Sequence, residues 1–288
     1  MQPKNPEEMY QNAPAELVER LRAFRAAYPY RRLQAGGLEW EYIASGQGQQ
    51  AVLILGGGMS LGESSFNTIL RLEKGFRVIS PSYPAVGKMR PIADGLAAII
   101  EQEGFNCANV MGHSLGAGVG HVFVRLHPER VDKLVLDGFG LYTPGHVRAA
   151  KLFFKLPYPI IMAYYRRVLK KYAAQARDDE QVFFTAYLEE VMTRLHTRQT
   201  LMGQFKLLMD ISDHAEEYGV FGPVERPGKV LLILAEDDRG FSLQERQALK
   251  DSYPGAQVHS FSSGGHLAGL SRRDEFNAVV DEFLGKAP

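Results

Sequence analysis

The chain has 288 residues, of which 45% are hydrophobic and 23% are charged, which is typical of an ordinary globular protein. Its 33 Lys and Arg residues equal its 33 Asp and Glu residues, so no overall charge favours nucleic acid or an acidic partner. The single cysteine, Cys107, excludes an intramolecular disulfide framework and a cysteine-based metal site.

The sequence indicates neither a secretory signal nor a membrane-spanning segment. The first stretch, MQPKNPEEMYQNAP, has no basic start and no apolar core, so it does not resemble a secretory signal. A membrane span needs roughly 18–20 apolar residues, and residues 152–165 come nearest but contain Lys155, Pro157 and Pro159. We therefore expect a cytoplasmic protein without an integral membrane segment.

The first half of the chain predicts strands that alternate with helices. Residues 31–49 indicate a hairpin around Gly36-Gly37, and AVLILGGG at 51–58 is a continuous apolar run, typical of a strand buried on both faces. Helix, strand, helix, strand, helix and strand are then predicted for residues 63–75, 76–84, 91–104, 107–114, 115–130 and 131–140.

The alternation resumes near the end of the chain, after a long helical interruption. Residues 141–226 show no strand pattern, and they are far longer than one crossover between strands requires. A strand, a helix, a strand with a loop and a closing amphipathic helix are predicted for residues 228–238, 242–255, 256–266 and 273–286. We therefore expect an α/β fold with a mostly parallel sheet and helices on both faces, formed by residues 1–140 and 227–288. Residues 141–226 are expected to form an inserted helical cap.

A candidate nucleophile lies in the motif Gly112-His113-Ser114-Leu115-Gly116. The predicted strand at 107–111 precedes the motif and a helix follows it, which is the context that a Gly-x-Ser-x-Gly turn requires. Glycines two positions before and after Ser114 permit a sharp turn in which strand and helix approach closely. A serine that only caps the helix would explain the residue in isolation, so the rest of the site must decide.

A serine hydroxyl needs a base, and we expect that base to be His266. His266 follows the last predicted strand, and the carboxyl ends of parallel strands lie at one edge of a sheet. The residue His113 adjoins the serine, but a tight turn should direct its side chain elsewhere. An imidazole also needs an orienting carboxylate, and Asp238 follows the penultimate predicted strand, with Asp137 as the fallback.

Acyl transfer places negative charge on an oxygen, so the site also needs fixed hydrogen-bond donors. One should be the backbone N–H of Leu115, directly after the serine. The other should come from the loop LGGGMS, where Gly58 or Met59 would supply the amide.

These motifs together resemble the α/β-hydrolase superfamily, and more closely its cap-bearing serine hydrolases, which include carboxylesterases. The segments GGLEWEYIASGQG, LILGGG, VMGHSLGAG, LAEDD and GGH follow the family's order over nearly the whole chain. The resemblance implies that Ser114 is the nucleophile, Asp238 the acid and His266 the base. Where the family often carries His-Gly, this chain has Gly56-Gly57, which adds Gly57 to the candidate oxyanion donors.

Two departures weaken the match around the acid, and one local similarity opens an alternative. The family's usual glycine before the acidic pair is Ala235 here, and the usual proline after the pair is absent. The segments VISPSYPAVGKM and ADGL are similar to the maspardin-type branch of the family. That similarity leaves a non-catalytic binding protein as an alternative.

The expected activity is hydrolysis of carboxylic esters with small or medium acyl chains through an acyl-enzyme, without a metal or an organic cofactor. Related hydrolysis of a thioester, lactone, amide or carbon–carbon bond stays open. A serine at position 114 argues against dehalogenase and epoxide hydrolase chemistry, because those reactions need a carboxylate nucleophile. The small-molecule ester is the only partner that the sequence predicts, and it leaves the oligomeric state open.

The predicted cap should select the substrate. Its aromatic and aliphatic residues would either line an apolar pocket or hold the cap helices onto the sheet. Residues 148–177 contain eight Lys or Arg and no Asp or Glu. Three interpretations of this basic stretch stay open: a solvated helix face, peripheral contact with an anionic membrane surface, or attraction of an acidic substrate.

Overall fold

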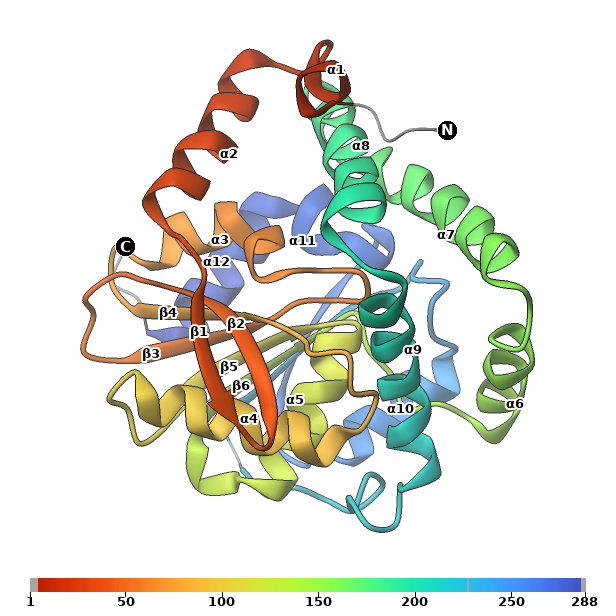
Figure 1. Cartoon of the computed structure of the whole chain (residues 1–288). Coiled ribbons are helices and arrows are strands. Elements are labelled where there is room, and N and C mark those ends of the chain that lie inside the picture. The colour runs from red at the N-terminus through yellow and green to blue at the C-terminus, as the bar shows by residue number, and fades with distance from the viewer. Residues whose placement is uncertain (1–4, 227, 286–288) are drawn as a thin grey trace.

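The computed structural model describes residues 5–226 and 228–285, and its centre is a twisted eight-stranded sheet (Figure 1). The strand order is β1-β2-β4-β3-β5-β6-β7-β8; the pairs β1–β2 and β2–β4 are antiparallel and all later pairs are parallel. The strands are β1 Arg31–Ala35, β2 Leu38–Ser45, β3 Ala51–Leu55, β4 Arg77–Ser82, β5 Ala108–His113, β6 Val131–Asp137, β7 Val230–Ala235 and β8 Gln257–Phe261. The predicted α/β fold with a mostly parallel sheet is therefore confirmed.

Helices cover both faces of the sheet, because the central strands are apolar on both sides. In β3, Leu53 and Leu55 pack with α4 and α5, whereas Val52 and Ile54 pack with α3 and α12. The helices of the core are α3 Phe66–Leu72, α4 Met89–Gln102, α5 Leu115–Leu126, α10 Leu243–Asp251, α11 Ala268–Ser271 and α12 Arg273–Leu284, with short 3₁₀ turns at Gly62–Ser65, Pro128–Arg130 and Gly265–Leu267.

The register of the parallel strands brings four loops to one edge of the sheet. Leu55 at the end of β3 pairs with Gly112 of β5, and His113 at the end of β5 pairs with Asp137 of β6. The strand β7 ends at Ala235, which pairs with Phe261 at the end of β8. The segments after β3, β5, β7 and β8, which carry the candidate site residues, therefore emerge side by side.

Four helices and a π-turn lie between β6 and β7, where the sequence predicts a cap. They are α6 Pro144–Phe153, α7 Tyr158–Ala173, α8 Gln181–Glu190, the π-turn Val191–Leu195 and α9 Arg198–Asp213. No strand occurs between residues 141 and 226, all of which the structure describes. Figure 1 shows these helices beside the sheet edge at which the loops gather. The domain division itself stays a prediction, and its limits at residues 1, 227 and 288 lie outside the described residues.

Two amino-terminal helices, α1 Pro6–Tyr10 and α2 Ala15–Ala27, were not predicted from the sequence. A partly buried polar cluster joins them to α8 and to the segment after β3. The Arg25 guanidinium lies 2.6 Å from Glu63 beside the sheet and 2.9 Å from Glu190 of α8. The hydroxyl of Tyr10 donates to the same Glu190 at 2.7 Å.

Two further predictions concern the closing helix and membrane-spanning segments. The closing helix α12 ends at Leu284, where Gly285 takes a left-handed conformation with φ 77°, so it stops before the predicted end. Lys286, included in that prediction, lies outside the described residues. None of the helices described is both long enough and apolar enough to cross a bilayer.

Candidate active site

Ser114 occupies a strained turn between β5 and α5. Its φ of 51° lies in the left-handed region, which among described non-glycine residues it shares with Met59 alone. A Cβ at Gly112 would overlap the carbonyl of Gly116, and one at Gly116 would overlap the carbonyl of Leu55. Both glycines are therefore required by the close approach of strand and helix, as the motif predicts.

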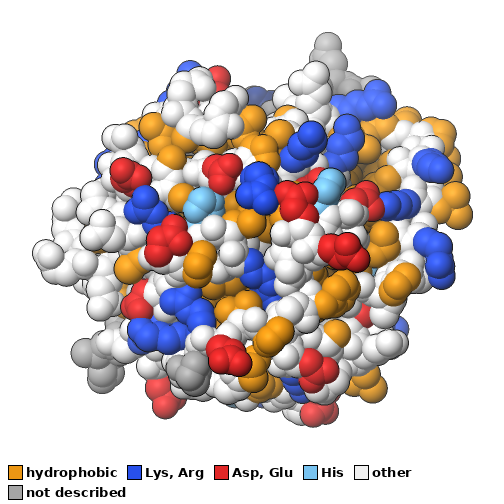
Figure 2. Space-filling model, turned by 90° about the horizontal axis from the view of Figure 1, so that it is seen from below, with side chains coloured by type: hydrophobic (Ala, Val, Ile, Leu, Met, Phe, Trp, Pro, Cys, Tyr) orange, Lys and Arg blue, Asp and Glu red, His pale blue; other side chains and the backbone are white. Residues whose placement is uncertain are grey.

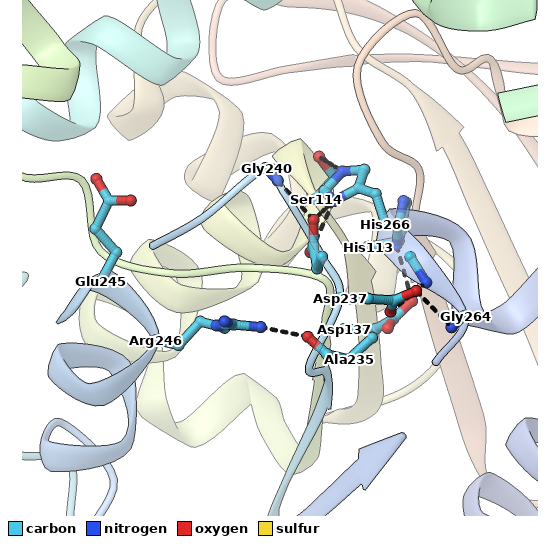
Figure 3. A network of polar contacts seen from close by, with 12 residues as sticks. His113, Ser114, Asp137, Ala235, Asp237, Gly240, Glu245, Arg246, Gly264 and His266 are labelled. Atoms are coloured by element: carbon cyan, nitrogen blue, oxygen red, sulfur yellow. Dashed lines mark hydrogen bonds and ion pairs between the residues drawn. The ribbon is translucent and has the colours of Figure 1, made fainter. Parts of the chain in front are cut away.

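The side chains of Ser114, His266 and Asp238 form a continuous hydrogen-bonded chain. The Ser114 hydroxyl lies 2.9 Å from Nε2 of His266, and Nδ1 of His266 lies 3.0 Å from Oδ2 of Asp238. With its proton on Nδ1, the imidazole donates to the carboxylate and accepts from the serine. Figure 3 shows Ser114 and His266 pointing toward each other from the ends of their loops. The arrangement can move a proton from the hydroxyl to the imidazole.

Asp238 is buried, and its surroundings stabilise the ionised form. Burial raises the pKa of its carboxyl, but hydrogen bonding and positive charge from His266 and the Gly240 amide outweigh burial and lower the pKa below its usual value. The Gly240 N–H donates to Oδ1 of Asp238 at 2.7 Å. Nearby, the Arg246 guanidinium donates to the carbonyl of Ala235, which holds the end of β7 in place (Figure 3).

The neighbouring Asp237 holds the loop that carries His266. Its carboxylate accepts the amides of Gly264 at 3.3 Å and Gly265 at 2.8 Å, directly before the histidine. Both glycines have positive φ, 147° and 63°, so the loop takes a backbone path that other residues rarely adopt. The two adjacent aspartates therefore diverge: Asp238 contacts His266, whereas the exposed Asp237 holds the backbone of the loop before it.

A second histidine–aspartate pair lies beside the first. Nδ1 of His113 donates to Oδ2 of Asp137 at 2.8 Å, and the two side chains extend from paired positions at the ends of β5 and β6. The His113 ring lies 5.1 Å from the His266 ring, centroid to centroid. Asp137, the fallback acid, thus contacts His113 (Figure 3). The acid that contacts His266 is Asp238.

The loop after β3 contains the candidate oxyanion donors, and one of them is already engaged. The Met59 amide donates to Oε1 of Gln204 at 2.6 Å, while the Gln204 amide donates to the carbonyl of Ser60 at 3.1 Å. Nε2 of His196 donates to the Met59 carbonyl at 3.0 Å. Burial lowers the pKa of His196, which favours this neutral imidazole. Residues of the cap segment thus hold both backbone polar groups of Met59.

The amides of Gly57, Gly58 and Leu115 form no hydrogen bond within residues 5–226 and 228–285. A Cβ at Gly57 would lie 3.6 Å from Cβ of Ser114, so this glycine approaches the serine closely. Around Gly58, no atom lies within 4 Å of a Cβ position, so its surroundings are open. Leu115 begins α5, where the helix leaves its first amides unpaired. These three amides therefore remain available to an oxyanion.

A cavity of about 280 Å³ opens beside the serine turn, and neither Ser114 nor His266 is among its lining residues. One side of it is formed by the loop of residues 56–60 after β3, here called the oxyanion loop, by His113 and by the segment after His266. Helices α3, α8 and α12 form the other side. Its basic side chains among the described residues are Arg71, Arg273 and His113. Arg71 pairs with Asp281, and Arg273 lies within hydrogen-bond distance of both carboxylate oxygens of Glu180. Both arginines that face this cavity therefore already have a counter-charge.

Aromatic side chains enclose His266 on its other sides. The Tyr172 ring of α7 stacks on the imidazole at 5.6 Å, and the Phe241 ring lies 6.1 Å away. Burial raises the pKa of Tyr172 to about 12, so its hydroxyl stays neutral near physiological pH. These rings limit access of water to the hydrogen bond between His266 and Ser114.

The other histidines are engaged elsewhere. His121 is fully buried, where burial holds its pKa well below the usual value, and Tyr253 contacts its Nδ1 at 2.9 Å. The remaining pairs are His127 with Asp94, His146 with Glu245, His214 with Asp210 and His259 with Glu275. None of these five hydrogen-bonds to Ser114 in the part of the chain that the structure describes.

Sequence reasoning did not identify Gln204, His196 as a partner of Met59, or Tyr172. Gln204 and His196 lie 145 and 137 positions from Met59, with no local motif around them. The available signal was weak: a polar Gln204 among the apolar residues of a helix, where a buried amide needs a partner. Its target could not be deduced without the docking of α9.

Comparison with protein families gives a match over residues 51–279 to a model described as alpha/beta hydrolase family. A similar curated protein is a 2-hydroxy-6-oxononadienedioate/2-hydroxy-6-oxononatrienedioate hydrolase of Klebsiella pneumoniae subsp. pneumoniae. It is 26% identical over 265 residues, which cover 84% of this chain and 89% of that protein.

Two solved structures show the same fold. An epoxide hydrolase from Bacillus megaterium, solved with an inhibitor, is 17% identical with a TM-score of 0.67, and the match covers 89% of this chain and 100% of that one. A meta-cleavage product hydrolase from Pseudomonas fluorescens IP01 is 20% identical with a TM-score of 0.61, covering 90% of this chain and 98% of that one. At these identities the likeness concerns the fold.

Proposed function

We propose that this chain, which belongs to the alpha/beta hydrolase family, is a serine hydrolase that uses Ser114 as its nucleophile. The observation that carries the proposal is the unbroken series of hydrogen bonds from Ser114 through His266 to Asp238. The family includes enzymes with different nucleophiles, and a serine at this position directs the chemistry toward carbonyl carbons. Hydrolysis is the common reaction of the family, and the serine triad specifies its route.

In the first half of the reaction, the Ser114 oxygen attacks the carbonyl carbon while its proton moves to Nε2 of His266. The negative charge of ionised Asp238 stabilises the imidazolium that forms. The carbonyl oxygen becomes an oxyanion, and the collapsing intermediate expels an alkoxide that takes the proton from His266. The products of this half are the free alcohol and an ester between the acyl group and Ser114.

In the second half, water attacks the acyl-enzyme and His266 accepts a proton from that water. The second tetrahedral intermediate collapses, the carboxylic acid leaves, and the proton returns to Ser114. The same imidazole thus acts as base and then as acid in each half.

We assign the oxyanion donors to the amides of Leu115 and of Gly57 or Gly58. Support comes from the hydrogen bond between Met59 and Gln204, which occupies the amide of Met59. Leu115 contributes from the first turn of α5, where the helix dipole also favours negative charge. Two fixed amides near the developing charge are the usual requirement for acyl transfer.

The proposed substrate is a neutral carboxylic ester with a small or medium acyl chain. Support comes from the surroundings of the base, where the rings of Tyr172 and Phe241 lie 5.6 Å and 6.1 Å from the His266 imidazole. Arg71 and Arg273 line the neighbouring cavity and are already paired with acidic residues. An anionic substrate that extended into that cavity would have to compete with those pairs, which favours a neutral one.

Carbon–carbon bond hydrolysis is the second candidate, and the comparisons favour it. The Klebsiella relative is named for the cleavage of a dicarboxylate, 2-hydroxy-6-oxononadienedioate. A triad of this kind can attack a ketone as well as an ester, provided that the departing carbon is stabilised as an enolate. Ester hydrolysis and carbon–carbon bond hydrolysis therefore differ in the charge of the substrate and in the group that leaves, which is an alkoxide from an ester and an enolate from a ketone.

The first experiment measures hydrolysis of p-nitrophenyl acetate, butyrate and octanoate by wild type and Ser114→Ala. We expect the wild type to hydrolyse the two shorter esters faster than the octanoate, and Ser114→Ala to lose at least about 10⁴-fold in kcat/KM. A fluorophosphonate should label wild type at Ser114 and leave the variant unlabelled.

The same preparations are assayed with 2-hydroxy-6-oxononadienedioate by the loss of its absorbance. Turnover of this compound with no turnover of esters would replace the ester assignment with the second candidate. If neither class is hydrolysed and the fluorophosphonate does not react, the binding-protein alternative takes precedence over both.

We propose the cytoplasm as the location. Support comes from cysteine usage, because the sequence carries one cysteine, which is present as a free thiol. Fractionation of cells that express the tagged chain tests this assignment, and recovery in an oxidising compartment would contradict it.

A further inference from the structure

Exposed apolar side chains gather on two helices of the cap segment. Leu152 is 70% exposed, Leu156 42%, and Ile160 and Tyr164 52% each. They fall within thirteen consecutive positions at the end of α6, in the α6–α7 turn and along α7. The Phe153 ring contacts the Tyr164 ring at 4.9 Å, so the two helices present their exposed groups together.

The same surface is basic, and most of its charge is unpaired. Of the eight Lys and Arg residues at 148–177, three have acidic partners: Lys151 with Asp213, Arg166 with Glu189 and Arg177 with Asp274. The other five are exposed and form no ion pair within residues 5–226 and 228–285; they are Arg148, Lys155, Arg167, Lys170 and Lys171. Figure 2 shows Lys or Arg and hydrophobic side chains next to one another along its right-hand margin, the side on which α6 lies in Figure 1.

Helix α7 has two different faces. Ile160, Tyr164, Arg167 and Lys171 follow one another at spacings of four, three and four, so they lie on one exposed face. On the opposite side, Met162 packs near Met59 of the oxyanion loop. Helix α7 itself therefore separates its solvent-facing side from the candidate site.

We propose that this face, formed by the α6–α7 turn and the exposed side of α7, docks onto the surface of an anionic lipid bilayer. A bilayer interface accommodates both kinds of group: cations meet the headgroups, while Leu156, Ile160 and Tyr164 enter the boundary of the acyl chains. Five unpaired cations supply the charge complementarity in a chain whose formal net charge is zero. Nucleic acid would satisfy the cations but leave the protruding apolar groups in water.

Docking in this orientation places the site close to the membrane. The helix that meets the lipid is also the helix whose Tyr172 stacks on His266. The lipid contact itself rests on the exposed face alone and does not depend on the proposed ester hydrolysis.

The test is cosedimentation of the full chain with sucrose-loaded vesicles of pure phosphatidylcholine, or of phosphatidylcholine with 30 mol% phosphatidylglycerol. We expect wild type to bind the anionic vesicles at least about tenfold more tightly than the neutral ones, and high salt to weaken that binding. The charge variant is Lys155→Gln/Arg167→Gln/Lys171→Gln, which should lose about fivefold per charge removed.

The apolar variant is Leu156→Glu/Ile160→Glu, which should lose at least about tenfold in binding. Its matched control is Phe221→Glu/Leu243→Glu, which adds the same charge at two other exposed apolar positions, 62% and 77% exposed. The control should keep at least half of the wild-type affinity for the anionic vesicles.

Folding is monitored separately by circular dichroism without vesicles, and the spectrum should be the same in all four proteins. The proposal is overturned if wild type fails to bind anionic vesicles, binds neutral vesicles equally well, or binds them no better than the charge or apolar variant. It is also overturned if the control loses as much affinity as the apolar variant. None of these results depends on whether wild type hydrolyses esters.

Discussion

Two histidine–aspartate pairs flank Ser114, and they differ in what their imidazoles can reach. His266 and Asp238 come from loops after β8 and β7, and Nε2 of His266 lies 2.9 Å from the serine hydroxyl. His113 and Asp137 are the last residues of β5 and β6, and their 2.8 Å contact lies beside the cavity. In the described structure, His113 forms no hydrogen bond with Ser114.

The difference shows that the direction of a side chain matters more than proximity in sequence. His113 adjoins the serine, yet it is the last residue of β5 whereas Ser114 lies in the turn that follows, and the His113 ring contacts Asp137 and faces the cavity. His266 is 152 positions away but lies on a loop whose path Asp237 fixes. The loop after β8 therefore directs His266 toward the serine, whereas the end of β5 does not direct His113 toward it.

The largest predicted effect separates the two imidazoles. His266→Gln should lower kcat for p-nitrophenyl acetate by at least about 10⁴-fold, because no other base reaches the hydroxyl. The matched variant His113→Gln should keep kcat within about tenfold, because the partner of His113 is Asp137 rather than Ser114. Steady-state kinetics of both variants measure the contrast. Equal losses of kcat in the two would contradict the assignment of roles.

The carboxylates should repeat this contrast. Asp238→Asn should cost about 10⁴-fold in kcat, because an amide permits the wrong tautomer of His266. Asp137→Asn should instead act on folding, with a loss of about 1–3 kcal/mol in the free energy of unfolding. Urea unfolding and kinetics on the same preparations distinguish the two. A loss of kcat in Asp137→Asn as large as that in Asp238→Asn would contradict the assignment of Asp238 alone and return Asp137 to consideration as the acid.

Gln204 of α9 is a further polar side chain at the site, where it contacts Met59 and Ser60 of the loop after β3. Gln204→Leu removes the partners of the Met59 amide and the Ser60 carbonyl, so the oxyanion loop should move and kcat should fall about tenfold. Gln204→Glu keeps an acceptor for Met59 and should lose less. If both variants retain wild-type kcat with only lower stability, Gln204 has a purely structural role.

The smallest effect is on the pH dependence of stability. The pKa of Asp238 is lowered on folding, so its contribution is complete above the unfolded value of about 3.9 and is lost as pH falls through the lower folded value. Wild type should therefore lose part of its stability advantage over Asp238→Asn between pH 5 and pH 2. Urea titrations across this range test the sign. An advantage that grows on acidification would show that the carboxyl pKa is raised.

Much of the fold could be predicted because apolar periodicity and glycine positions are local. The run at β3 and the glycines around Ser114 act within a few residues, and the structure has the strand and the sharp turn that they predict. The amino-terminal helices were missed. Helix α2 is stabilised by contacts such as Arg25 with Glu63 and Glu190, which lie far along the chain.

The candidate site follows the same division. The gathering of Ser114, Asp238 and His266 could be predicted because parallel topology places strand ends at one edge. The engagement of the Met59 amide by Gln204 could not, because it depends on how α9 docks 145 positions later. Likewise, the basic stretch at 148–177 left three interpretations open, and the exposure of Ile160 and Tyr164 supports the proposed lipid contact among them.

By itself, the sequence determined the family, the mostly parallel sheet and the position of Ser114, Asp238 and His266 after strand ends, because each depends on local pattern and chain order. The tertiary structure decided which imidazole faces the hydroxyl, which amides remain available and which side of α7 meets solvent. Those features depend on side-chain direction and on contacts between distant segments, and these are fixed only when the helices pack on the sheet.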